Sequence, residues 1–257
     1  MNINAPLNTH IPGLRQLWTE AFGDSDEFLD LFFKTAFSPN RCRCITQETS
    51  VVAALYWFDC SHKGQKIAYV YAVATSLSHR GQGLCHKLME DTHVHLKNLG
   101  YQHVLLVPGS ESLFHFYQSI GYQICSYINE IHLEAASAPD SNSNCSFQEI
   151  DKHNFAALRQ QYLPEGSVIQ TDENLNFLET MAKFYVGNRF LLAACRRGND
   201  LLGIELLGDA SVAPYLLSAL GYKKGTFRTP GTERAFSMYY PLINGAVPPT
   251  YFGFAFD

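Results

Sequence analysis

The residues with the clearest chemical use are an arginine and two glycines in the stretch Arg80-Gly81-Gln82-Gly83. An apolar run at 69–75 precedes them, and apolar residues with helical spacing begin at Leu84. The first amides of a helix have no partner within the helix, and the helix dipole makes that end positive. Glycine lets a bulky anion approach without meeting a Cβ, and arginine suits phosphate oxygens. The stretch therefore predicts a site for a pyrophosphate or for a molecule that carries one.

The spacing of this turn excludes two common phosphate-binding motifs. A P-loop needs a Gly-Lys-Ser/Thr sequence before its helix, and the turn has none. A dinucleotide fingerprint needs a third glycine at position 86, where this chain has His86. What remains is Arg-Gly-x-Gly-x-small, which ends at Cys85 and follows a strand that closes with Val73-Ala74-Thr75.

This pattern resembles the acyl-CoA-binding motif of the GCN5-related N-acetyltransferases, the GNAT superfamily. In that family the strand edge holds the pantetheine and the amides of the turn hold the pyrophosphate. The resemblance implies acetyl-CoA, or another acyl-CoA, as co-substrate, and no metal. The cofactor contacts that it implies are Val73, Thr75, Arg80, Gly81, Gln82, Gly83, Leu84 and Cys85.

A second stretch is similar to another signature of the same family. Residues 101–108 are predicted to form a buried strand, and a helical stripe of apolar residues follows and ends at Gly121. The sequence Phe116-Tyr117-x-x-x-Gly121-Tyr122 resembles the family's signature, in which the tyrosine points at the thioester sulfur. The resemblance makes Tyr117 the general acid for the departing thiolate. It also places Ser110, where the family has an asparagine, among the cofactor contacts.

The general base that would accept the proton of the amine is left open by the sequence. The strand from Ala68 to Thr75 carries no carboxylate, where many relatives keep a glutamate. Glu111, the terminal Asp257 or a chain of waters could serve. Asp257 is our assigned base, by analogy with tandem relatives that place their terminal carboxylate in the acceptor site. The alternative for this aromatic tail, which we expect to be packed, is edge-strand packing.

Residues 9–38 are predicted to form two helices. Asn8 or Thr9 can cap the first, and Asp24 or Ser25 can cap the second. The carboxylates at the start of the second helix either face water or line an acceptor site that favours a cation. The side chains expected to face inward are Ile11, Leu14, Leu17, Trp18, Phe22, Phe28, Leu31, Phe32 and Ala36.

The order of the expected elements predicts an α/β (α+β) fold with a mixed β-sheet flanked by helices. The GNAT resemblance covers about residues 1–134, which are the expected catalytic domain. Residues 135–146 are small, polar and aperiodic, and they are predicted to be a linker.

Residues 147–257 are predicted to be a degenerate GNAT-like domain, because Leu220-Gly221-Tyr222 repeats Ile120-Gly121-Tyr122. Two segments of this part, 150–163 and 174–184, are expected to be helical. It has no Arg-Gly-x-Gly turn, and Asp209 stands where it would repel phosphate. We expect this half to bind no CoA but to complete the core, close the acceptor pocket or form the face of a homodimer.

Composition narrows the class of protein further. The net charge of −5 and the pI of about 6.0 give no sign of binding to nucleic acid or to an anionic membrane. No run resembles a signal peptide or a membrane span. Seven scattered cysteines suit free thiols in a reducing cytoplasm, and Cys42-Arg43-Cys44 lacks the spacing of a metal site. The ten histidines have no ligand spacing, which favours surface imidazoles.

Together these features predict a cytoplasmic, acetyl-CoA-dependent N-acetyltransferase. It would transfer an acetyl group directly to an amine of a small molecule or peptide, without an acyl-enzyme. The alternative is a non-catalytic acyl-CoA-binding regulatory protein, which would keep the Arg80–Cys85 turn and have no use for Tyr117.

Overall fold

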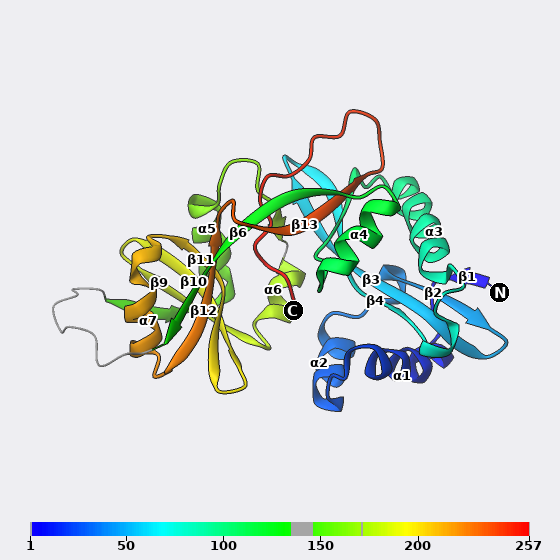
Figure 1. Cartoon of the computed structure of the whole chain (residues 1–257), viewed down its shortest axis with the longest axis horizontal. Helices are drawn as coiled ribbons and strands as arrows, with labels where there is room; N and C mark the ends of the chain where they lie inside the picture. The colour runs from blue at the N-terminus through cyan, green and yellow to red at the C-terminus, as the bar shows by residue number, and fades with distance from the viewer. Residues whose placement is uncertain (1, 135–145, 171, 257) are drawn as a thin grey trace. The chain divides into compact units, whose positions relative to one another are not determined.

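The computed structural model describes residues 2–134, 146–170 and 172–256, and the chain forms two compact units (Figure 1). The N-terminal unit combines Met1–Gln123 with Met238–Pro248, and the C-terminal unit combines Ile124–Ser237 with Pro249–Asp257. These units differ from the contiguous domains 1–134 and 147–257 that the sequence predicts. Most of the predicted linker, 135–145, lies outside the described residues. Among the described residues, no helix is long and apolar enough to span a membrane.

The sheet of the N-terminal unit is mixed, as predicted. Its strands, in spatial order, are β1 (Asn2–Asn4), β2 (Cys42–Gln47), β3 (Ser50–His62), β4 (Gln65–Thr75), β5 (His103–Leu106) and the end of β13 (Arg234–Pro241). Strands β1 to β4 pair antiparallel, β4 and β5 pair parallel, and β13 pairs antiparallel with β5.

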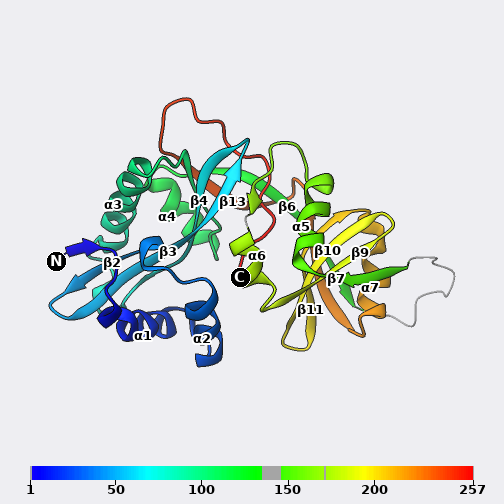
Figure 2. The same ribbon diagram turned by 180° about the vertical axis from the view of Figure 1, so that it is seen from behind.

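Helices cover both faces of this sheet (Figures 1 and 2). One face carries α1 (Ile11–Phe22) and α2 (Asp26–Thr35), and the other carries α3 (Leu84–Asn98) and α4 (Glu111–Ser119). Two neighbouring residues of β3 show this directly, because successive side chains of a strand point to opposite faces. Tyr56 packs against Trp18 of α1, with ring centroids 5.1 Å apart, and Trp57 packs against His95 of α3 at 5.9 Å.

The C-terminal unit repeats this order of elements with its own strands and helices. The sheet runs β6 (Gln123–Glu134), β12 (Lys224–Pro230), β11 (Asp200–Gly208), β10 (Phe190–Arg197), β9 (Ala182–Gly187) and β7 (Phe147–Ile150). The remaining elements are α5 (Lys152–Tyr162), β8 (Ile169–Gln170), α6 (Asp172–Leu178) and α7 (Ala213–Ala219). Helix α5 packs on β9, β10 and β11, and α7 packs on an apolar cluster that includes Phe190, Leu192 and Phe227. The antiparallel series β7-β9-β10-β11 and the parallel neighbour β12 correspond to β1-β2-β3-β4 and β5.

Each unit takes its last strand from a distant part of the sequence. Met238 of β13 pairs with Leu106 of β5 in the N-terminal unit. Ile131 of β6 pairs with Phe227 of β12 in the C-terminal unit. This exchange of strands explains why the units are not contiguous in sequence. The strand after α4 is β6, which belongs to the C-terminal unit, and the strand after β12 is β13, whose end belongs to the N-terminal unit.

The C-terminal tail is packed, as expected from its aromatic residues. Tyr251, Phe252, Phe254 and Phe256 are at most 6% exposed. The amide of Val168 donates to the carbonyl of Tyr251 at 2.9 Å, and the ring of Phe256 lies 5.2 Å from that of Phe177. The tail thus belongs to the core of the C-terminal unit.

Three expectations for individual elements were wrong. The helix expected over 174–184 ends at Leu178, because Ala182–Gly187 pairs antiparallel with both β10 and β7. Phe22 and Leu31 do not face inward but are 46% and 38% exposed. Helix α1 follows a short 3-10 turn and has no side-chain cap, whereas the Ser25 hydroxyl does cap α2 by accepting from the amide of Phe28 at 3.3 Å.

Candidate functional site

Strands β4 and β5 pair over only a short stretch before they separate. Their parallel register runs from Ile67↔His103 to Tyr69↔Leu105, and β4 then continues to Thr75 while β5 ends at Leu106. A bulge interrupts the pairing of β4 with β3 just beyond this point, and Ala72 there has φ +49°. A bulge leaves local backbone groups unpaired and bends the strand. The backbone around half-buried Val73 and Thr75 is therefore placed at a strand edge where a ligand can bind.

The turn that follows β4 opens α3, as the sequence predicts. Gly81 and Gly83 have φ +76° and +71°, a region that favours glycine, and a Cβ at either would meet nothing within 4 Å. Gly83 is the N-cap of α3 and, as a glycine, offers no side chain to accept from the first amides of the helix. Leu84 is 4% exposed and fixes the start of the helix in the core. The turn thus presents the positive end of a 15-residue helix to open space.

The polar side chains of this turn are exposed and fold back on the preceding backbone. The guanidinium Nε of Arg80 donates to the carbonyl of Thr75 at 3.2 Å, and the amide of Gln82 donates to the carbonyl of Ser78 at 3.5 Å. Because Arg80 is exposed and its guanidinium contacts the last residue of β4, its positive charge lies between the end of that strand and the glycine turn.

Tyr117 of α4 and Cys85 of α3 lie together beside this turn. Tyr117 is 6% exposed, and burial, together with the neighbouring Cys85 thiol, holds its pKa well above its usual range. Burial also raises the pKa of Cys85 to about 11. Both groups keep their protons near neutral pH. Tyr117 has a proton to give, and Cys85 is not a ready thiolate nucleophile.

The remaining predicted residues lie apart from this pair or outside the described part of the chain. Ser110 is the N-cap residue of α4, and its hydroxyl contacts that of Ser112 at 3.0 Å rather than the first amides of the helix. Glu111 lies in the first turn of α4 and is exposed. The predicted base Asp257 lies outside the described residues, so its role stays a prediction.

The sequence analysis missed a buried polar group behind Tyr117. His93 is 9% exposed, its Nε2 lies 2.8 Å from the hydroxyl of Tyr122, and its ring stacks on Tyr240 at 4.1 Å. Burial, with a smaller effect of His86, lowers the pKa of His93 to about 4. The expectation of a surface imidazole was wrong here. Helical spacing could have corrected it, since position 93 lies on the same stripe as buried Met89 and Leu96.

The corresponding turn of the C-terminal unit is closed by its own carboxylate. Asp209 accepts from the backbone amide of Ser211 at 3.0 Å and from its hydroxyl at 2.6 Å, and Arg189 pairs with Asp209 at 2.9 Å. An anion would have to displace this carboxylate. The following helix, α7, has only seven residues.

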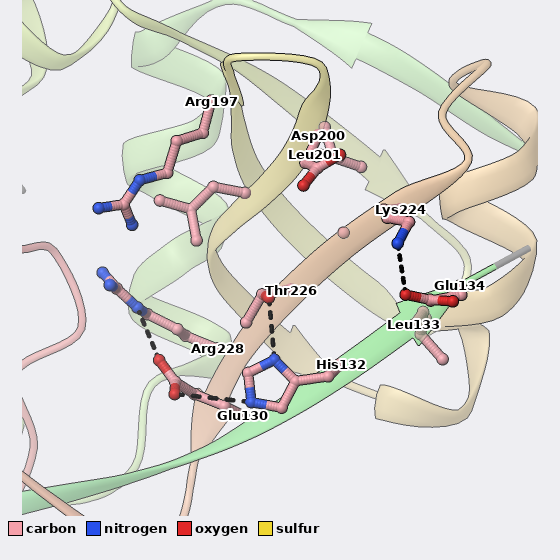
Figure 3. Close-up of a pocket in the computed structure, with 12 residues that line it drawn as sticks. Glu130, His132, Leu133, Glu134, Arg197, Asp200, Leu201, Lys224, Thr226 and Arg228 are labelled. Carbon is pink, nitrogen blue, oxygen red and sulfur yellow. Dashed lines mark hydrogen bonds and ion pairs between the residues drawn. The ribbon is translucent and has the colours of Figure 1, made fainter.

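A polar cavity of about 650 Å³ lies on the sheet of the C-terminal unit (Figure 3). Its charged side chains largely satisfy one another: Lys224 pairs with Glu134 at 2.6 Å, and Glu130 pairs with Arg228 at 3.4 Å. The balance of opposite charges gives this cavity no preference for a phosphate, in contrast to the turn at Arg80.

A comparison with known protein families matches the part of the chain that contains the Arg80 turn and Tyr117. The family described as acetyltransferase (GNAT) domain matches residues 3–125. No curated protein matches the sequence.

Solved structures resemble nearly the whole chain in fold. A GCN5-related N-acetyltransferase from Anabaena variabilis has a TM-score of 0.73 at 15% identity, over 94% of this chain and 73% of that one. A probable N-acyltransferase from Enterococcus faecalis has a TM-score of 0.70 at 12% identity, over 94% and 72%. A GCN5-related N-acetyltransferase from Sphaerobacter thermophilus has a TM-score of 0.59 at 11% identity, over 95% and 96%.

The matched family, the mixed sheet with helices on both faces, and the glycine turn that opens α3 after the bulged strand agree with one another. Residues 3–125 of this chain therefore match the GNAT family of acetyltransferases, and the chain shares the fold of solved GNAT structures.

Proposed function

We propose that the protein is an acetyl-CoA-dependent N-acetyltransferase that transfers the acetyl group directly to an amine. The observation that carries the proposal is the uncapped, glycine-lined start of α3 at the end of the bulged strand β4. The residues present fit an acyl-CoA, because a side chain at Gly81 or Gly83 would fill space that is open in this structure. The GNAT domain itself implies acetyl-CoA as the acyl donor.

The binding roles follow from what each segment offers. The amides from Gly81 to Cys85 would bind the pyrophosphate, with Arg80 adding a cation and Gln82 an amide at the rim. The edge of β4 at Val73 to Thr75 would hold the pantetheine arm, and its N–H groups would polarise the thioester carbonyl. Acetyl-CoA supplies an activated acetyl group when it is bound. Ser110 is proposed as a further contact at the start of α4.

Proton transfer is assigned to Tyr117, which remains protonated at neutral pH and lies beside the α3 turn. It would donate its proton to the departing thiolate. The high pKa of Cys85 argues against a covalent acyl-enzyme on that residue. Direct transfer needs only that both reactants are held together. Asp257 remains the proposed base.

The C-terminal unit is proposed to be a degenerate GNAT-like domain that binds no CoA. Its order of strands supports a common origin with the N-terminal unit, and the closed Asp209 turn supports the loss of the anion site. Its proposed roles are to complete the core and the acceptor pocket.

The test of the cofactor site is acetyl-CoA binding by calorimetry in Gly83→Asp, with Gly64→Asp as control. Gly64 has nearly the same backbone conformation, φ +74° against +71°, and equally open surroundings, but it lies in the turn between β3 and β4. Both variants carry similar strain and charge. We expect an affinity loss of at least about tenfold in Gly83→Asp and little change in Gly64→Asp. Equal affinities in the two variants would refute the site.

The test of catalysis is thiol release from acetyl-CoA over a panel of amines, in the native protein and in Tyr117→Phe. The variant should bind acetyl-CoA normally and turn over about a hundredfold more slowly. An unchanged rate would remove Tyr117 from the mechanism. Tight binding without turnover on any amine would point instead to a regulatory acyl-CoA-binding protein.

A further inference from the structure

The residue that closes the end of α4 is bonded to Tyr117 through its backbone. Gly121 has φ +95°, and its amide donates to the carbonyl of Gln118 at 3.0 Å. The amide of Tyr122 donates to the carbonyl of Tyr117 at 3.0 Å. These two bonds form a Schellman motif, which fixes the chain as it leaves a helix. The backbone of Tyr122 is therefore tied to the residue that we propose as general acid.

The side chain of Tyr122 packs against the ring of Tyr117 as well. The two ring centroids are 5.5 Å apart and the ring planes are inclined by 63°, which is an edge-to-face contact. Tyr122 is 2% exposed, and burial holds the pKa of its hydroxyl well above the usual range. A buried, protonated hydroxyl requires a hydrogen-bond partner, so that partner helps to decide where the Tyr122 ring lies.

His93 on α3 is this partner. Its Nε2 lies 2.8 Å from the Tyr122 hydroxyl, and because burial lowers its pKa to about 4, the imidazole is neutral near neutral pH. The ring of Tyr240, on β13, stacks on the imidazole with centroids 4.1 Å apart and planes inclined by 14°. A Cβ at Gly121 would lie 3.0 Å from the Tyr240 ring, so the glycine leaves that ring the space it needs. The imidazole is thus held by a hydrogen bond at its edge and by a ring on its face.

The hydrogen bond between His93 and Tyr122 connects the two helices that the proposed reaction uses. Helix α3 begins after Gly83, where the pyrophosphate would bind, and carries His93 farther along the same helix. Helix α4 carries Tyr117, whose hydroxyl would have to meet the sulfur of that same acetyl-CoA molecule. A misplacement of about 1 Å can slow such a reaction by about a hundredfold. The separation between the start of α3 and the Tyr117 hydroxyl therefore matters, and this hydrogen bond is one of the contacts that set it.

We infer that His93 is a positioning residue: through its hydrogen bond to Tyr122, it holds the Tyr117 hydroxyl at the place where the thiolate would leave. The inference rests on the proposed function, which makes Tyr117 the acid, and it adds a histidine that acts on the reaction through Tyr122. Tyr240 supports the imidazole from β13, so a strand that is distant in sequence helps to place the acid.

The experiment measures turnover and acetyl-CoA binding in variants of this hydrogen bond. Turnover is followed by thiol release with the best amine of the panel, and binding is followed by calorimetry. Tyr122→Phe keeps the ring and removes the hydroxyl, and His93→Leu removes the partner; each should lower kcat about tenfold or more and leave the affinity for acetyl-CoA unchanged. His93→Gln should keep most of the rate, because its amide nitrogen can take the place of Nε2. The double variant His93→Leu, Tyr122→Phe should be no slower than the slower single variant, since both changes remove one bond.

The matched control is Tyr101→Phe, which removes another buried tyrosine hydroxyl from the same unit. Tyr101 is also 2% exposed, and its hydroxyl accepts from Trp57 Nε1 at 3.1 Å and donates to the carboxylate of Asp59. Both partners lie on β3, so this variant should lower the melting temperature, as Tyr122→Phe does, but keep the native kcat. A native kcat in either Tyr122→Phe or His93→Leu, or an equal fall of kcat in Tyr101→Phe, would overturn the inference.

An NMR measurement tests the same link without turnover. The tyrosines are isotopically labelled at Cζ, and the signal of Tyr117 among the 14 tyrosines is assigned by its absence in Tyr117→Phe. His93→Leu should shift the Tyr117 signal through Tyr122, and Tyr101→Phe should not. An unmoved Tyr117 signal in His93→Leu would overturn the inference even if the protein acetylates an amine; if His93→Leu does not fold, Tyr122→Phe takes its place. Failure of the native protein to bind acetyl-CoA or to acetylate any amine would refute the proposed function, and the NMR result would then decide on the link between His93 and Tyr117 by itself.

Discussion

A buried ion pair holds the C-terminal tail, and breaking it is the sharpest stability test that the structure offers. Arg159 Nε and the carboxylate of Glu205 are 2.6 Å apart, with side chains 4% and 0% exposed. The Tyr251 hydroxyl donates to the same carboxylate at 3.1 Å, and the ring of Phe254 lies 4.1 Å from the guanidinium. A Cβ on Gly253 would come within 1.9 Å of Glu205 Oε1, so the tail fits this pair closely.

Replacing Arg159 by methionine keeps most of the apolar stem and removes the charge. Glu205 then stays buried, and among the described residues only the Tyr251 hydroxyl still donates to its carboxylate. An uncompensated buried charge of this kind costs about 3–5 kcal/mol. At about 2–4 °C per kcal/mol for a chain of this size class, the melting temperature should fall by roughly 6 to 20 °C.

Differential scanning calorimetry measures this fall, and Lys224→Met is the control. Lys224 and Glu134 are also 2.6 Å apart, but their side chains are 57% and 76% exposed, so water screens the pair and we expect it to contribute little to stability. The double variant Arg159→Met, Glu205→Leu should regain part of the loss, because no lone charge is left in the core. If Arg159→Met melts within 2 °C (roughly the effect of 1 kcal/mol) of the control, the reasoning from burial is refuted.

Two more outcomes follow from buried groups and from the exchanged strands. Because the pKa of His93 is about 4 in the folded state against 6.5 when unfolded, the unfolded chain takes up its proton first as the pH falls. The free energy of unfolding should therefore drop by roughly 3 kcal/mol between pH 6.5 and 4, and His93→Gln should show a smaller drop in urea titrations; identical pH profiles would contradict the burial of His93. A fragment 1–134 lacks β13 and a fragment 147–257 lacks β6, so neither should melt cooperatively alone, whereas the co-expressed pair should; a cooperative melt of either fragment by itself would count against the exchange.

The local elements that position the proposed cofactor site could be predicted from sequence because their signals are local. The strand before Arg80, the glycine turn and the helix from Leu84 all lie where periodicity and turn chemistry place them. The cap at Ser25 and the helix that carries Tyr117 follow from similar local rules. The backbone conformation at Gly81 and Gly83 is dictated by a few neighbouring residues, so the turn could be predicted from the sequence alone.

The features that sequence reasoning missed depend on residues far apart in the chain. Tertiary pairing with β10 and β7 makes Ala182–Gly187 a strand, although the sequence predicted that the helix begun at residue 174 would continue to residue 184. The burial of His93 depends on Tyr240 of β13, which follows it by well over a hundred positions. The bulge at Ala72 could not be read from the apolar run, since a strand with one extra residue has the same composition as a regular one.

The two units share one order of strands but differ at the turn that follows the longer strand of their parallel pair. Both have a parallel strand pair that separates, and both continue from the longer strand into a turn and a helix. In the N-terminal unit the turn is uncapped and leads into a helix of 15 residues. In the C-terminal unit Asp209 satisfies the turn, the helix has seven residues, and Gly253 of the tail packs against Glu205 on β11. The same position in the fold is therefore filled by a carboxylate in the C-terminal unit and lined by two open glycines in the N-terminal unit, and this difference is why we propose anion binding at the Arg80 turn and not at the Asp209 turn.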